Sequence, residues 1–140
     1  MTEPTTSSVE DRMAIEDTLN RLCRALDQAD WEAMRDLLAP DVSWTSAAFG
    51  THHGAEGWIE NQVSSRSRLE RAQHLISNLI VELDGDTARV ESYVQGYDVF
   101  TGHEERVIRI VGTYHDELAR IDGRWLVTSR RFDRLWLDPL

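Results

Sequence analysis

Apolar residues near the start of the chain recur with a helical period. Between positions 15 and 26 they fall every three or four places, which is one stripe of an α-helix: Ile15, Leu19, Leu22, Cys23 and Leu26. Asp27 follows directly, at the margin of this stripe rather than opposite it. A carboxylate at that place either faces water or is held inside the fold, where it needs a partner to offset its desolvation.

Two further helices are predicted before the pattern changes. Asp30 is a suitable N-cap for a short helix over 31–38, which Pro40 closes. A third helix is predicted from Ala55, with Trp58 and Ile59 on one side. Between and after these helices we expect a short strand over 42–45, a loop of small residues over 46–54 and a polar connector over 64–73.

From position 74 the pattern becomes that of β-strands. Four segments rich in Val, Ile, Tyr and Trp are separated by glycine turns of hairpin length. The predicted strands are 74–83, 88–100, 106–120 and 125–137, and the turns are 84–86, 101–103 and 122–123. Three helices before a four-strand antiparallel meander predict an α+β fold, with helices covering one face of a curved sheet. Gly96 and Gly112 are expected bend or bulge points.

Length and charge narrow the class of protein. A chain of 140 residues predicts one domain, here 10–140, after a short disordered lead over 1–9. The single cysteine excludes an internal disulfide framework, and with it we expect a cytoplasmic protein. No apolar run is long enough for a membrane span. The net charge of −10 argues against nucleic acid or an anionic membrane as a partner, because both bind basic surfaces.

The five tryptophans allow two interpretations. They can belong to ordinary core and dimer packing, or they can line a pocket for an apolar molecule. In the second case Trp44 and Trp58 are the expected substrate-binding aromatics.

Several motifs in one order suggest a family. They are RALDQADWEAMRDLLAPDVSW, GAEGWI, QHLISNLIVELDGDTARVESY and GTYHDELARIDGRWLVTSRRF. With these, the chain resembles the SnoaL-like branch of the nuclear transport factor 2-like superfamily over about residues 10–137. The resemblance implies a cone-shaped, cystatin-like α+β barrel with an apolar pocket at its open end. It also implies a homodimer through the outer sheet face. Relatives include polyketide cyclases, scytalone dehydratase, bile-acid dehydratases and a dehydrochlorinase.

The dehydratase and dehydrochlorinase relatives suggest a catalytic pair. They carry an Asp at the end of the first helix and a His at the start of the strand after the third helix, and Asp27 and His74 occupy these places. A neutral imidazole is a base suited to physiological pH, and a carboxylate on its other nitrogen fixes its tautomer. The alternatives are an inert histidine and a carboxylate that faces water. Many such relatives have a Tyr or Lys where this chain has Leu22, so any assistance to a leaving group must come from elsewhere.

Further candidates for contact with a substrate lie on the predicted strands. Neighbours on a strand alternate in direction, so one of Tyr97 and Asp98 should face the pocket. Asp98 is preferred, because the residues that share its face of the strand are the less bulky ones: Val90, Ser92, Val94 and Gly96. Tyr114 and Asn78 are candidates on other strands. Arg130 can bind a leaving group or carboxylate, with a surface arginine as the alternative.

No metal or cofactor is expected. The segment from His103 lacks the second histidine of a zinc-binding HExxH, and no phosphate-binding glycine loop or nucleophile triad is present. The sequence predicts a cofactor-independent acid–base enzyme acting on a small apolar cyclic metabolite, by dehydratase, isomerase or cyclase chemistry. The alternative is a non-catalytic binding protein or the small subunit of a ring-hydroxylating dioxygenase.

Overall fold

The computed structural model of the chain describes residues 6–139, and the side chains of 8–103 and 106–139. Within this range the elements are α1 (Thr6–Gln28), α2 (Trp31–Asp36), β1 (Leu38–Ser46), β2 (Gly50–His53), α3 (Ala55–Arg66), β3 (Leu69–Asp84), β4 (Thr87–Phe100), β5 (His103–Ile121) and β6 (Arg124–Pro139). The predicted α+β class is confirmed.

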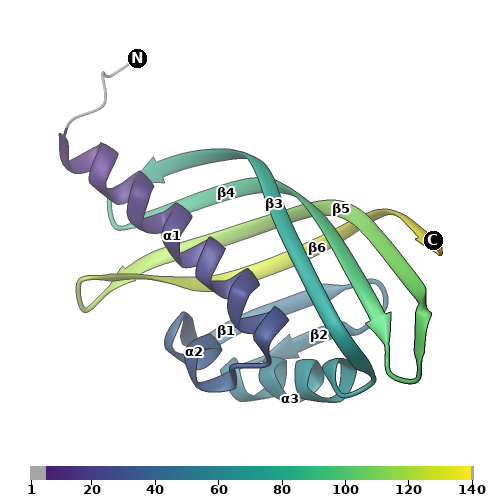
Figure 1. Cartoon of the computed structure of the whole chain (residues 1–140). Helices are drawn as coiled ribbons and strands as arrows, with labels where there is room; N and C mark the ends of the chain where they lie inside the picture. Colours follow the sequence, from purple (N-terminus) through teal and green to yellow (C-terminus); the bar gives the residue numbers. More distant parts are fainter. Residues whose placement is uncertain (1–5, 140) are drawn as a thin grey trace.

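The strands form one curved sheet in the order β2-β1-β6-β5-β4-β3. Neighbours are antiparallel except β1 and β6, which run parallel. Figure 1 shows α1 crossing the sheet, with α2 and α3 gathered at the end near β1 and β2. The long strands curve around a space that these helices close. No helix of the described residues is long and apolar enough to cross a membrane.

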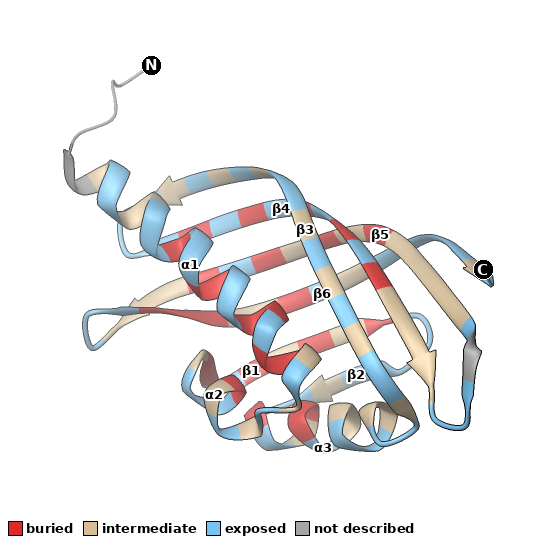
Figure 2. Cartoon of the chain, in the orientation of Figure 1, coloured by how far each residue is buried: buried red, intermediate tan, exposed pale blue. Residues whose placement is uncertain are grey.

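The predicted apolar stripe of α1 faces this sheet. Ile15, Leu19 and Leu22 are completely buried, and the buried positions of α1 lie on its sheet side in Figure 2. They pack against the concave side chains of the long strands, which include Ala88, Val90, Val94, Tyr114, Leu118 and Val127. Because the stripe buries its apolar surface mainly against this sheet, the packing of the core sets where the end of α1 lies.

The first two helices differ from their predicted bounds. α1 begins at Thr6, so residues 6–9 of the expected disordered lead are helical, and residues 1–5 lie outside the described part. The Asp30 cap is confirmed, since its Oδ1 accepts a bond from the Ala33 amide at 3.1 Å. The helix ends at Asp36 rather than at 38. The reason is tertiary, because Leu38 already pairs with β6.

The segment predicted as a loop over 46–54 contains strand β2. It forms a hairpin with β1, and Gly50 supplies the turn with a φ of +72°. β1 is also longer than the predicted 42–45, because it pairs along β6 from position 38. The predicted connector over 64–73 is largely ordered: α3 continues to Arg66 and β3 begins at Leu69.

The predicted meander of four long strands is confirmed, with its three turns in the predicted places. Gly112 lies at a register shift between β5 and β6, as expected of a bulge point. A Cβ there would overlap the backbone carbonyl oxygen of Asp133 and press on the Phe132 ring. Glycine at this position therefore allows the close approach of two strands.

Candidate active site

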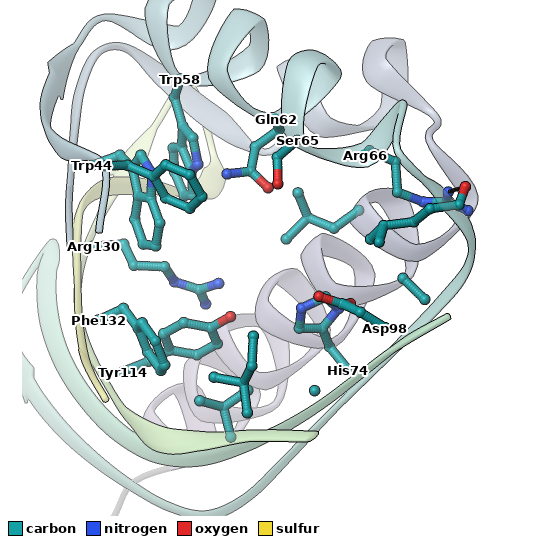
Figure 3. Close-up of a pocket in the computed structure, with 17 residues that line it drawn as sticks. Trp44, Trp58, Gln62, Ser65, Arg66, His74, Asp98, Tyr114, Arg130 and Phe132 are labelled. Atoms are coloured by element: carbon teal, nitrogen blue, oxygen red, sulfur yellow. Dashed lines mark hydrogen bonds between the residues drawn. The ribbon is translucent and has the colours of Figure 1, made fainter. Parts of the chain in front are cut away.

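A cavity of about 150 Å³ lies between the end of α1, α3 and the concave face of the sheet. Figure 3 shows aromatic side chains on one side and His74 with Asp98 on the other. The lining residues are Leu26, Trp44, Phe49, Trp58, Gln62, Ser65, Arg66, Leu69, Ala72, His74, Val94, Gly96, Asp98, Ile110, Tyr114, Arg130 and Phe132. A mostly apolar wall with a few polar groups is typical of a small-molecule site.

Asp27 and His74 meet at the wall of this cavity. Oδ1 of Asp27 lies 2.6 Å from Nδ1 of His74, and Oδ2 accepts the His74 backbone N–H at 3.0 Å. The Asp27 side chain is only 12% exposed, so the alternative of a carboxylate turned to water is wrong. With Asp27 ionised, the proton on the imidazole is held at Nδ1 and Nε2 is left as a base.

Gly96 makes room for this imidazole. A Cβ at Gly96 would lie 3.2 Å from Cδ2 and 3.3 Å from Nε2 of His74. Both residues line the cavity and are paired across β3 and β4. The edge of the ring that carries Nε2 therefore rests on bare backbone beside the cavity.

Arg66 ties the elements around the dyad together. From the end of α3, its Nη1 donates to the Leu69 carbonyl at 2.7 Å, and its Nη2 donates to the Asp27 carbonyl at 3.0 Å. It links the end of α1 to the start of β3, which carry Asp27 and His74. Sequence reasoning did not find Arg66, since a basic residue in a polar segment carries no signal of such contacts.

Of the two neighbours on β4, Asp98 faces the cavity. Burial raises the pKa of its carboxyl group, while the nearby His74 and Arg66 lower it by a smaller amount. Tyr97 does not line the cavity, and its hydroxyl lies 3.2 Å from Oε1 of Gln95. This agrees with the expectation that one of the two faces the pocket and with the preference for Asp98, while Tyr97 does not line the cavity.

Arg130 is buried, not a surface residue. Its Nε and Nη2 donate to Asp116 at 2.7 and 3.0 Å, and its guanidinium carbon lies 3.7 Å from the centre of the Tyr114 ring. Burial alone would lower the pKa of Arg130, but the Asp116 carboxylate raises it overall, so the group stays charged. Its Nη1 is buried and has no partner among the described residues. Figure 3 shows the guanidinium directed into the cavity.

The aromatic wall adjoins Arg130. Trp44 pairs with Arg130 across β1 and β6, and its indole stacks on that of Trp58 at 5.2 Å between ring centres. Tyr114 and Phe132 meet edge to face at 5.6 Å. Burial raises the pKa of the Tyr114 hydroxyl, which is therefore neutral. The structure thus places three predicted pocket residues at the cavity wall: Trp44, Trp58 and Tyr114.

Asn78 is the second predicted contact that the structure places elsewhere. A register shift separates Ser77 from Ile80, and Asn78 within it has a φ of +55° and is exposed. The alternation that puts His74 on the concave face breaks at this bulge. Asn78 therefore does not line the cavity.

Sequence reasoning also missed several lining residues, including Phe49, Gln62, Ser65 and Phe132. They come from β2's hairpin, α3 and β6, and only folding brings them together. Leu22 lies in the core, completely buried, so its place offers no proton donor. The described residues contain no group of three or more His, Cys, Asp or Glu side chains that could hold a metal ion.

The fold and this site define a small α+β barrel with a largely apolar pocket, at whose wall an aspartate is hydrogen-bonded to a histidine. The family model described as a SnoaL-like domain matches residues 7–131, and the chain belongs to this family.

Three individual proteins are similar over most of the chain. An uncharacterised protein of Mycobacterium tuberculosis strain H37Rv is 25% identical over 125 residues, which cover 89% of this chain and 85% of that protein. The structure of a proposed aromatic ring hydroxylase from Novosphingobium aromaticivorans is 26% identical with a TM-score of 0.87, covering 94% of each chain. That of a type 3 hexachlorocyclohexane dehydrochlorinase from Novosphingobium barchaimii is 23% identical with a TM-score of 0.85, covering 94% and 91%. The last likeness shows a shared fold.

Proposed function

We propose that this protein is a cofactor-independent acid–base enzyme that acts on a small apolar cyclic molecule. His74 is the general base, and Asp27 orients it. The observation that carries the proposal is the 2.6 Å contact between Asp27 and Nδ1 of His74, with the other edge of the imidazole at the cavity wall.

In the proposed step, Nε2 of His74 removes a proton from a carbon of the bound molecule. The electron pair of the broken C–H bond moves into the substrate, and the imidazole becomes a cation that Asp27 stabilises. A positioned general base contributes typically ~10²–10⁴ in rate. Water elimination, halide elimination, double-bond migration and aldol-type cyclisation all begin with this step.

A leaving group or a developing negative charge needs assistance from a residue other than Leu22. Asp98 can supply a proton, because burial raises the pKa of its carboxyl group. Arg130 can donate from the free Nη1 to an anion or an oxyanion. With these two groups, dehydratase-type elimination is our first choice among the reactions: the proton leaves to His74, and the departing hydroxyl takes one from Asp98.

The proposal is tested with a panel of cyclic alcohols, halides and ketones incubated with the protein in D₂O. Nuclear magnetic resonance then detects elimination products or deuterium at carbon. For any compound that reacts, we expect His74→Ala to lower kcat by about 10²–10⁴ and Asp27→Asn to lower it too. His53→Ala is the matched control, because His53 is exposed on β2 and should keep wild-type turnover.

Turnover near the wild-type value in both His74→Ala and Asp27→Asn would refute these roles. The KM should change less than kcat, since neither side chain is proposed to anchor the substrate.

The second candidate function is that of a binding protein or a small subunit of a ring-hydroxylating dioxygenase. One comparison favours it, since the structure that is 26% identical belongs to a proposed aromatic ring hydroxylase. A bound molecule recovered unchanged, or co-purification with a large iron-containing chain, would support this function. Turnover by the isolated chain that depends on His74 would exclude it.

A further inference from the structure

Four buried N–H groups of the cavity-lining residues have no acceptor among the described residues. They are Nη1 of Arg130, Nε1 of Trp44, Nε1 of Trp58 and Nε of Arg66. Buried donors in folded proteins nearly always have a partner, and an unpaired one costs about 1–3 kcal/mol. Four such donors at one cavity indicate that the partner is a bound molecule that supplies an acceptor.

Three of these donors, those of Arg130, Trp44 and Trp58, lie together on one side of the cavity, whereas Arg66 lies on the side of Asp98 in Figure 3. Trp44 is in register with Arg130 across β1 and β6, and Trp58 stacks on Trp44. Figure 3 shows them across the cavity from His74 and Asp98. The cavity therefore has a donor side and a basic side. A molecule that spans it presents an electron-pair donor to Arg130 and a C–H group to His74.

The balance of charges argues against an anionic ligand. Two guanidinium groups lie at or in the cavity wall, those of Arg66 and Arg130. Three carboxyl groups accompany them, those of Asp27, Asp98 and Asp116. With the proton kept on Asp98, the two guanidinium groups balance the carboxylates of Asp27 and Asp116, so a carboxylate ligand would leave the cavity with a net negative charge.

The cavity also limits size. About 150 Å³ is the size of a protein cavity that accommodates a single benzene ring. Phe49, Trp58 and Phe132 supply flat apolar surface around it. One six-membered ring with a short substituent fills this space.

We infer that the substrate is an uncharged single-ring carbonyl compound, whose oxygen accepts a hydrogen bond from Arg130 while its acidic C–H group lies at His74. This deepens the proposed function, on which the catalytic part rests. An imidazole is too weak a base to remove a proton from an unactivated carbon, and a conjugated carbonyl is the common way to acidify one.

The step balances within the bound molecule. The C–H bond breaks and its proton goes to Nε2 of His74. The electron pair delocalises onto the carbonyl oxygen as an enolate, and Nη1 of Arg130 donates to the charge that develops there. The enolate then takes a proton elsewhere on the ring or expels a leaving group.

Binding of three matched probes tests the acceptor and the charge. Acetophenone carries a neutral carbonyl, benzoate replaces it by a carboxylate, and ethylbenzene has no acceptor. We expect isothermal titration calorimetry to show acetophenone binding about tenfold more tightly than either of the others, the ratio of one hydrogen bond to a charged donor. 2-Acetylnaphthalene, with a second ring, should bind more weakly than acetophenone.

The variant Arg130→Met should remove the preference for acetophenone over ethylbenzene and leave ethylbenzene binding unchanged. Because this substitution leaves Asp116 buried without a partner, Arg130→Met/Asp116→Leu is the second variant, with both charges removed. Arg131→Met, at the exposed neighbouring position, is the control and should bind all probes as the wild type does.

Benzoate binding as tightly as acetophenone would overturn the inference, as would equal affinity for acetophenone and ethylbenzene. If 2-acetylnaphthalene binds more tightly than acetophenone, or if no one-ring probe binds at millimolar concentration, the substrate is not limited to a single ring. These binding measurements need no turnover, so their outcome is independent of the kinetic test of His74. Neutral-ketone selectivity without any proton exchange would refute catalysis alone, and His74-dependent turnover with benzoate preferred would refute this inference alone.

Discussion

At the scale of single residues, the proposed catalytic pair depends on Gly96, which has no side chain. The His74 ring rests against Gly96, where any Cβ would lie within 3.3 Å of two ring atoms. The contact that positions the imidazole from the other side is its bond to Asp27. The geometry of the base is therefore set between a carboxylate and bare backbone.

Gly96→Ala should displace the His74 ring by a few tenths of an ångström and lower kcat, by about 10–100-fold, since misplacement of ~1 Å costs ~10². The midpoint of urea unfolding should change little. Steady-state kinetics on a reacting compound and urea unfolding measure both. Gly57→Ala in α3, where a Cβ meets nothing within 4 Å, is the control and should keep wild-type kcat. Unchanged kcat in Gly96→Ala would show that the ring position is not critical.

Arg130 and Asp116 form a buried ion pair, so removal of one member should be costly. Arg130→Met leaves a buried charge without a partner and should lower the free energy of unfolding by about 3–5 kcal/mol. Arg130→Met/Asp116→Leu should recover most of that loss, since apolar replacement of a whole pair is often neutral. Urea unfolding measures both. If the double variant is no more stable than the single one, the unpaired Asp116 charge is not the cause.

Asp98 should make stability depend on pH. An unfolded Asp ionises near 3.8, while burial keeps the proton on folded Asp98 to higher pH. The unfolded state thus loses its proton first, and stability falls as pH rises from about 3.8 through the raised pKa of Asp98. Asp98→Asn should therefore be more stable than wild type at pH 7 and equally stable below about pH 3.8. The exposed Asp41→Asn should show no such gain, and a loss of stability in Asp98→Asn at pH 7 would contradict this view.

At the scale of elements, two interior glycines have opposite roles. Gly112 in β5 allows β6 to approach, and a Cβ there would overlap the Asp133 carbonyl oxygen. Gly57 in α3 has no such neighbour, and glycine in a helix interior is unfavourable relative to alanine. Replacing glycine by alanine should therefore lower the free energy of unfolding in β5 and raise it in α3.

Gly112→Ala should lower the free energy of unfolding by about 1–3 kcal/mol, the usual cost of overpacking. Gly57→Ala should raise it by about 0.5–1 kcal/mol. Thermal or urea unfolding of both variants tests this pair. Destabilisation by both would mean that Gly57 has a packing role of its own.

At the scale of the whole molecule, the convex face of the sheet carries an apolar row. Leu75, Gln95, Val111 and Trp136 are in register across β3, β4, β5 and β6, and Tyr93 lies beside them, 59% exposed. Three of the four residues of the row are apolar, although this face points away from the cavity. Exposed apolar patches of this kind mark interaction surfaces.

We propose that this row is the centre of a homodimer interface, in which each copy buries about 800 Å². Tyr93→Arg should then convert the dimer to a monomer, which analytical ultracentrifugation detects, without loss of ligand binding in the cavity. Arg131→Met at the edge of the face is the control. A wild-type chain that is monomeric at tens of micromolar would refute this interface.

The sequence by itself determined the helices, the four long strands and their glycine turns. It could do so because these features are local: the stripe of α1, the alternation of the strands and the glycines at the turns act within a few residues. It also indicated the two residues of the proposed catalytic pair, Asp27 at the margin of an apolar stripe and His74 at a strand entrance.

Only the tertiary structure decided where those residues lie and what they contact. β2 and the parallel pairing of β1 with β6 depend on segments far apart in the chain, which carry no local signal of each other. The bulge at Asn78 reversed a prediction from alternation, and the pairing with Asp116 decided between the two interpretations of Arg130, in favour of a buried donor. Burial, charge pairing and close approach arise between distant segments, so the site's chemistry was fixed by the fold that joins them.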